Sequence, residues 1–192
     1  MVSVASELGS KQRDDKLRNK AFTTAIRSLK QLRILWKDRP QEDQDRTVLM
    51  SGDVLIRRMK AEDEMNLEAQ AQETCAKAAG TLQAFLLEHE VSREVLSGEK
   101  PVVPERTVEK DGQQVVEPAQ FMTAAARDNL ARCYETLIPL YVRLGGDNLG
   151  FALKYGEEYL DLFPNGKART EIVNCMNQAK ADGVPAAAPA AE

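Results

Sequence analysis

The stretch EEYLDLFPNGKA, residues 157–168, ends one predicted helix and begins the next within a few residues. A helix-compatible run reaches Phe163, and Pro164 stops it because a proline drives the residue before it out of the α region. Asn165 and Gly166 are turn residues, and a second helix-compatible run follows them almost at once. Consecutive helices joined so closely lie antiparallel. The stretch therefore predicts helical hairpins stacked one against the next.

The composition also favours an all-α fold. Of the 192 residues, 43% are hydrophobic and 29% charged, which is typical of a soluble globular protein. Only 5% are aromatic, whereas the strong helix formers Ala, Leu, Glu, Lys, Arg and Gln are abundant. Valine, isoleucine and threonine gather into an alternating run only weakly, near residues 102–116. One domain, or one and a fraction, fits this length.

Apolar residues recur at steps of three and four along most of the chain, which predicts amphipathic helices. The first helix begins at about Asp14 and ends before Pro40, which opens the second. Residues 61–90 continue the helical pattern. They either extend the second helix as one rod or fold back at residues 63–66, and Asn66, a good N-cap residue, favours the break.

The chain divides into five segments by composition. They are a flexible N-terminus (1–12), N-terminal helical hairpins (13–90), a loop or insertion (91–118), C-terminal helices (119–182, in runs at about 119–144, 148–163 and 166–181) and a disordered Ala/Pro tail (183–192). The insertion contains VEKDGQQVV, which predicts an irregular loop or a small β-hairpin turning at Asp111-Gly112. Because long loops in compact domains are usually functional or mobile, it is either a partner-specific insertion or a slack tether.

The net charge of −4 is unevenly distributed. Residues 1–60 hold 14 Lys and Arg against 8 Asp and Glu, whereas residues 61–192 hold 12 against 22. A basic first third can attract an acidic partner, or the two parts of the chain can attract each other. The simpler interpretation is a solvated helix surface with a local charge imbalance.

The cysteines and the single histidine argue against a catalytic or metal site. Cys75, Cys133 and Cys175 lie far apart without a C-x-x-C pair, and one histidine leaves no imidazole set for zinc. We interpret the cysteines as buried, reduced thiols, and His89, on an apolar helix face, as a packed core residue. No P-loop, G-x-G-x-x-G or H-E-x-x-H motif occurs. We therefore expect no enzyme, no catalytic residue, no cofactor and no metal.

Two observations bear on location. No stretch approaches the roughly 18 apolar residues that a membrane-spanning helix needs. The start MVSVASELGSKQRDD lacks the charged region and the long apolar region of a secretory signal. We expect a cytoplasmic protein as the sequence stands, and another compartment if it is a fragment of a longer chain.

One helical face recurs three times in the sequence. Each copy begins with a small residue and ends with a large one eleven residues later. The three sets are Ala25, Leu29, Leu32 and Trp36; Ala78, Leu82, Phe85 and His89; and Ala152, Gly156, Tyr159 and Phe163. The spacing is that of any helix face. However, the small first residue lets a neighbouring helix approach closely, and the bulky last one fills the end of the pair.

Residues 134–168 carry a spaced set of aromatic, leucine, glycine, alanine and proline residues. They are Tyr134, Leu137, Tyr141, Gly145, Ala152, Pro164 and Ala168. This set resembles a tetratricopeptide repeat, and the aromatic–proline ending looks like that of repeats in bacterial envelope and assembly-factor proteins. The chain departs from the family at Ile138, where a small residue is usual, at Gly156, where an aromatic is usual, and at Tyr159, where alanine is usual. The alternative is an unrelated antiparallel helical bundle.

The resemblance implies a non-enzymatic scaffold or adaptor that binds a peptide or a partner helix in a concave groove, with no small-molecule substrate. The first-helix residues that would line the groove are Arg132, Glu135, Val142 and Arg143. The family's peptide-carboxylate clamp needs a lysine and an asparagine where this chain has Glu135 and Pro139, so we do not expect that subtype. Each of the four residues can equally be a solvated surface residue.

Two other functions stay open. The basic run of the first helix suits an acidic protein partner, a membrane surface or a nucleic acid, and its candidate contact residues are Lys16, Arg18, Arg27 and Lys30. Asp14 and Asp15 interrupt this run and the whole chain is acidic, which argues against nucleic acid. The chain can also be a structural helical subunit of a larger assembly, for instance an envelope-associated one.

Overall fold

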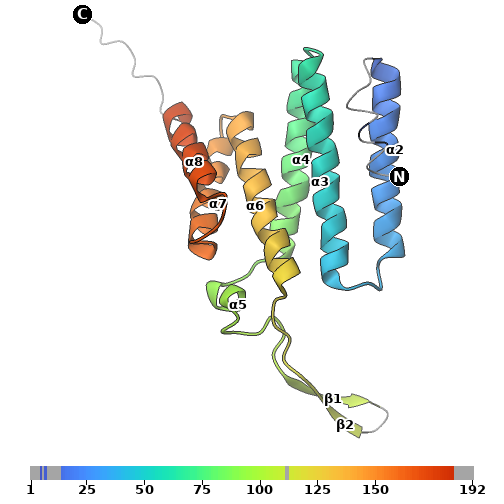
Figure 1. Ribbon diagram of the computed structural model, residues 1–192, viewed down its shortest axis with the longest axis vertical. Coiled ribbons are helices and arrows are strands. Elements are labelled where there is room, and N and C mark those ends of the chain that lie inside the picture. Colours follow the sequence, from blue (N-terminus) through green and yellow to red (C-terminus); the bar gives the residue numbers. More distant parts are fainter. Residues whose placement is uncertain (1–4, 6, 8–13, 111–112, 184–192) are drawn as a thin grey trace, which may run out of the picture.

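The structure is a computed structural model that describes residues 5, 7, 14–110 and 113–183. These residues form seven helices and one two-stranded antiparallel sheet (Figure 1). The elements are α2 (Asp15–Leu35), α3 (Gln41–Glu64), α4 (Glu68–Glu88), α5 (Arg93–Ser97), β1 (Arg106–Lys110), β2 (Gln113–Glu117), α6 (Ala124–Leu144), α7 (Asn148–Leu162) and α8 (Arg169–Gly183). The expected all-α class is confirmed, with the small sheet as an addition. The flexible start and the disordered tail predicted at 1–12 and 183–192 lie outside the described residues, apart from Ala5, Glu7 and Gly183.

Local signals set most helix ends. The Asp14 carboxylate caps α2 by accepting a hydrogen bond from the Leu17 amide at 2.9 Å. The open question at residues 63–66 is settled in favour of a hairpin, because α3 ends at Glu64 and α4 begins at Glu68. Asn66 is not the N-cap that we expected. It has a φ of +57° and reverses the chain, since asparagine tolerates the left-handed region better than most residues.

The insertion contains the β-hairpin that the sequence predicted. Arg106 pairs with Glu117 and Lys110 with Gln113, and residues 111 and 112, where the turn was expected, lie outside the described residues. Figure 1 shows this hairpin extending away from the ends of the helices. The next helix, α6, begins at Ala124 and not at about residue 119, because Gln120 still bridges Val103 before Thr123 caps the helix.

The long helices pack as two antiparallel hairpins flanked by single helices. The hairpin α3/α4 packs on the hairpin α6/α7 through contacts of α4 with α6 and of α3 with α6. The single helix α8 continues the row against α7 and α6, and α2 packs against α3 at the other end (Figure 1). Each unit therefore packs on the next unit along the chain.

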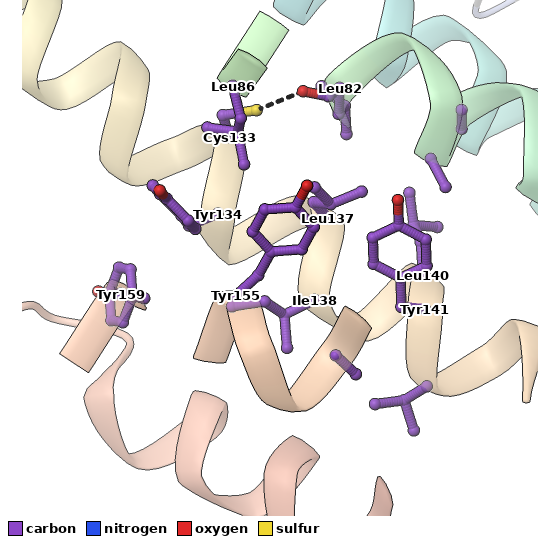
Figure 2. Close-up of a cluster of buried hydrophobic side chains, with 14 of the residues drawn as sticks. Leu82, Leu86, Cys133, Tyr134, Leu137, Ile138, Leu140, Tyr141, Tyr155 and Tyr159 are labelled. Carbon is purple, nitrogen blue, oxygen red and sulfur yellow. Dashed lines mark hydrogen bonds between the residues drawn. The ribbon is translucent and has the colours of Figure 1, made fainter. Parts of the chain in front are cut away.

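One hydrophobic core joins the two hairpins. It includes Leu82 of α4, Leu137 and Ile138 of α6, and Tyr155 of α7, all of them buried (Figure 2). The helix α2 is held mainly by a second, smaller cluster, whose buried members are Phe22, Ala25, Leu29, Val54 and Ala61. The largest share of buried apolar area, and hence of hydrophobic stabilisation, therefore lies between α3 and α8.

Two cysteines lie at the contact between α4 and α6. The Cys133 thiol of α6 donates to the Leu82 carbonyl at 3.3 Å, and the Cys75 thiol of α4 donates to the Leu140 carbonyl at 3.7 Å. Both are fully buried and free, as we expected, whereas Cys175 is free and half-buried. Burial raises the pKa of all three thiols, so they stay protonated near neutral pH.

The recurring helical face is buried most completely in α7. There Ala152, Tyr159 and Phe163 are buried, and Gly156 lies against Met176 of α8. A Cβ added at Gly156 would lie 2.6 Å from the Met176 side chain, so glycine is the residue that lets α7 and α8 approach this closely. In α2 the same face ends in residues that stay partly exposed, and among the described helices it is α3 that packs along α2.

We expect Gly156→Ala to destabilise the protein, although alanine favours helix. The added methyl group overlaps Met176, and overpacking of this kind typically costs about 1–3 kcal/mol, against a gain of about 1 kcal/mol in helix propensity. The matched control is Gly80→Ala in α4, which is exposed and has no atom within 4 Å of the added Cβ, so it should stabilise by about 0.5–1 kcal/mol. Urea denaturation followed by circular dichroism measures both changes. Equal stabilisation by the two substitutions would contradict the packing described for α7 and α8.

A second prediction concerns His89, which connects the end of α4 to the start of α3. Its Nε2 lies 3.0 Å from Oδ1 of the buried Asp45, and its Nδ1 lies 2.8 Å from the Phe85 carbonyl. Both ring nitrogens face acceptors, which favours the doubly protonated imidazolium. The hydrogen bond that His89 donates to the Asp45 carboxylate raises the pKa of His89 above its usual value, although burial opposes the shift.

A raised folded-state pKa makes the contribution of this contact largest at low pH. It is fully present below about pH 6.5, the value for an unfolded histidine, and it is lost as the pH rises through the higher folded-state pKa. We expect Asp45→Asn to lower the free energy of unfolding by about 1 kcal/mol at pH 5.5, since His89 is partly exposed, and by less at pH 9. The control is Asp38→Asn at an exposed site. If Asp45→Asn lowered the free energy of unfolding equally at both pH values, the charged form of His89 would contribute nothing to stability.

Candidate partner-binding groove

Of the four α6 residues expected to line a concave groove, three form contacts within the molecule and one is buried. Arg132 forms an ion pair with Asp53 of α3, and Arg143 donates to Asp63 of α3 at 2.6 Å. Glu135 accepts a hydrogen bond from the Tyr159 hydroxyl at 2.8 Å. Val142 is buried, so it cannot contact a partner in this conformation, contrary to our expectation.

These contacts connect neighbouring helices. Arg132 and Arg143 join α6 to α3, and Glu135 joins it to α7. Burial, together with the hydrogen bond to Glu135, raises the pKa of Tyr159 to about 12. The ion pair with Asp63 raises the pKa of Arg143. Arg132 and Arg143 remain partly exposed at the surface, and their expected role in binding a partner stays a prediction.

The four basic residues of the first helix are separated by the fold. Lys16 and Arg27 are exposed on α2. Arg18 is fully buried, and its guanidinium donates to the Met65 sulfur at the turn between α3 and α4, so the expectation that it faces a partner is wrong. Lys30 lines a groove that runs between α2 and α4.

This groove, which we call the basic groove, has a volume of about 350 Å³ and lies over α3. Its apolar floor is formed by Ile26 and Leu29 of α2 and by Val48 and Leu55 of α3. The remaining described lining residues are basic or carry a hydroxyl group; they are Lys30, Arg33, Thr47, Ser51, Lys77 and Thr81. None of the described lining residues is acidic.

The electrostatics of the basic groove favour an anionic ligand. Lys30 and Arg33 are exposed on one wall and form no ion pair among the described residues. Lys77, on the opposite wall, pairs with Glu73 at 2.5 Å, but both side chains are mostly exposed. Such surface pairs contribute little, so a ligand carboxylate can compete with Glu73 for Lys77.

The hydroxyl groups of the basic groove have their hydrogens committed to the helices. Thr47 donates to the Gln44 carbonyl at 2.7 Å, Ser51 to the Thr47 carbonyl at 2.9 Å, and Thr81 to the Lys77 carbonyl at 2.9 Å. The donors left for a ligand are therefore those of the lysine and arginine side chains. The groove can bind apolar side chains on its floor and carboxylates at its rim.

Only some of the residues that line the basic groove could be predicted from the sequence. Lys30 was a candidate, and Arg33 belongs to the same basic run. Lys77 lies 47 positions beyond Lys30 in another helix, and no sequence pattern connects the two. The apolar floor carried a signal, because Leu29 belongs to the recurring helical face and Val48 and Leu55 belong to the apolar pattern of the second helix.

No family model, curated protein or solved structure matches this chain. None of the helices in the described ranges is long and apolar enough to cross a membrane. Within residues 5, 7, 14–110 and 113–183, no group of three or more His, Cys, Asp and Glu side chains is placed to hold a metal ion. Function is therefore inferred from the surface of the helical stack.

Proposed function

We propose that this protein is a non-enzymatic scaffold of the tetratricopeptide type, which binds another protein. Two features support the fold part of the proposal. The units α3/α4, α6/α7 and α8 follow one another in space as in the sequence, which is the arrangement of helical repeat proteins. In the family an aromatic residue is usual at the position of Gly156 and an alanine at the position of Tyr159, so the small and the large residue are interchanged in this chain. The structure accommodates both, because Met176 fills the space beside the glycine and the tyrosine is fully buried.

The basic groove is the observation that carries the functional part of the proposal. An apolar floor between two basic walls is complementary to an amphipathic helix with leucine-like residues on one face and carboxylates beside them. The apolar face would bury against Ile26, Leu29 and Val48, and the carboxylates would pair with Lys30, Arg33 and Lys77. Charge complementarity of this kind mainly speeds association and selects the partner.

Binding of a synthetic peptide tests this proposal directly. The probe is a fluorescein-labelled amphipathic helical peptide with leucines at positions i, i+4, i+7 and i+11 and glutamates on the flanking positions. We expect saturable binding by fluorescence anisotropy that weakens as salt is added, because the rim contacts are ionic. The double variant Lys30→Glu/Arg33→Glu should weaken binding about tenfold or more, since each attraction becomes a repulsion.

The matched control is Lys16→Glu/Arg27→Glu, which makes the same change of charge on the exposed surface of α2 outside the groove. It should retain most of the affinity. A peptide with the same composition but scrambled leucine spacing should bind weakly. Equal losses in the two double variants, or tighter binding of single-stranded DNA that the groove variant abolishes, would overturn the proposal.

A structural subunit of a larger assembly is the second candidate. It is favoured by apolar side chains that stay exposed in the insertion and just after it, among them Val102, Val116 and Phe121, each of which is more than half exposed. Among the described elements, none packs extensively on the two-stranded hairpin, and a hairpin of this kind gains little stability by itself, so a neighbouring subunit could cover it. An obligate subunit should self-associate when isolated, whereas a scaffold that recruits partners transiently should sediment as a stable monomer.

A further inference from the structure

A second hollow lies on the other side of α4, between α4 and α7. Its volume is about 320 Å³, Tyr134 of α6 contributes to its floor, and residues 90–93 close one end. We call it the tyrosine pocket. It is arranged like the basic groove, as a depression between two helices with a third helix beneath them, but its lining is chemically different.

The tyrosine pocket presents aromatic rings. Tyr134 and Tyr155 are both buried to more than nine-tenths, and their rings meet edge to face with centroids 6.1 Å apart (Figure 2). Hydrogen bonds fix both hydroxyl groups. The Tyr134 hydroxyl donates to Glu158 at 3.2 Å, and Gln83 donates to the Tyr155 hydroxyl at 3.3 Å. The rings are therefore held in place before any ligand binds.

Three carboxylates line the tyrosine pocket together with the rings. Glu158 and Asp161 come from α7, and Glu90 comes from the segment after α4. Glu90 has no ion pair among the described residues, and it is exposed. Rings with carboxylates beside them are the arrangement that attracts a cation, through both the ring quadrupole and direct charge pairing.

Two cationic side chains of this chain, Lys154 and Arg93, already lie at the tyrosine pocket. The Lys154 ammonium lies over the Tyr155 ring, 5.4 Å from its centroid, and 3.8 Å from the Glu158 carboxylate. Arg93 lies 3.7 Å from Asp161. These side chains are more than half exposed and the ion pairs are long, so each contributes little and can be displaced.

We propose that the tyrosine pocket binds an arginine side chain of a partner polypeptide, and that Lys154 occupies the cation position when no partner is bound. A guanidinium can stack on Tyr155 and pair in a bidentate manner with a carboxylate, which a lysine ammonium cannot do. Leu87 is 67% exposed at the rim and offers an apolar contact to the residues beside the arginine. The site selects a basic segment, whereas the basic groove selects an acidic one.

The test uses a small probe, so it does not depend on the basic groove. N-acetyl-arginine amide is titrated into ¹⁵N-labelled full-length protein, and N-acetyl-citrulline amide, which is nearly the same shape but neutral, serves as the control ligand. We expect saturable chemical-shift changes confined to residues around the pocket, such as Leu87, Tyr134 and Tyr155, with arginine and none with citrulline.

Removing the internal lysine gives the most specific prediction. Lys154→Ala should tighten binding of the arginine probe by about threefold or more, because it vacates the ring face and frees Glu158. The control Lys180→Ala removes an equal charge from the exposed surface of α8 and should leave the affinity nearly unchanged. The double variant Glu158→Gln/Asp161→Asn, which keeps an acceptor for Tyr134, should weaken binding about fivefold or more.

Three results would overturn the proposal. They are equal shifts with arginine and citrulline, shifts spread over the acidic surface without a local centre, and unchanged or weaker binding by Lys154→Ala when its circular dichroism spectrum matches that of the unmodified chain. Failure here with intact binding of the acidic peptide would leave the scaffold function standing. Loss of acidic-peptide binding with intact binding of the arginine probe would rule out the basic groove as a binding site and leave the tyrosine-pocket proposal standing.

Discussion

The close contact between α4 and α6 is the interaction on which the rest of the structure depends. Cys75 and Cys133 lie at two separate points along this contact, and each thiol reaches a carbonyl of the opposite helix. Thiol hydrogen bonds are individually weak. Their value here is geometric, because a side chain as small as cysteine lets two helices approach within reach of each other's backbone. Ala78 and Ala79, both buried, lie between Cys75 and Leu82 on the same helix, and their small side chains also allow a close approach.

The position of α4 also determines where the two hollows lie. It forms one wall of the basic groove through Lys77 and one wall of the tyrosine pocket through Leu87. The two hollows therefore lie on either side of one helix that the core holds firmly, and they carry opposite charge. Because α4 packs on both α3 and α6, an acidic and a basic segment bound as proposed would lie on opposite sides of one helix.

The sequence predicted the parts of this fold that depend on local signals. Pro164 follows directly after a helix-compatible run, where a proline favours the end of the helix, and the hairpin ends were placed to within a few residues on evidence of this kind. Asn66 was misassigned because an N-cap and a left-handed turn favour the same residue type, and only packing distinguishes them. Arg18 was misassigned because a basic run does not show which side chains face inward. The basic groove joins Lys30 to Lys77, and such a pairing depends on how helices stack and not on any spacing.

Thiol labelling under native conditions tests the central claim, that the contact between α4 and α6 unites the two hairpins into one cooperative body. The labelling rates of Cys75 and Cys133 are measured by mass spectrometry at urea concentrations below the unfolding transition. We expect both cysteines to react only through global unfolding, with the free energy that circular dichroism gives for the whole chain, whereas half-buried Cys175 should react sooner. Labelling of Cys75 and Cys133 at a much lower free energy, while the helices stay intact, would show that the hairpins separate independently and would contradict this claim.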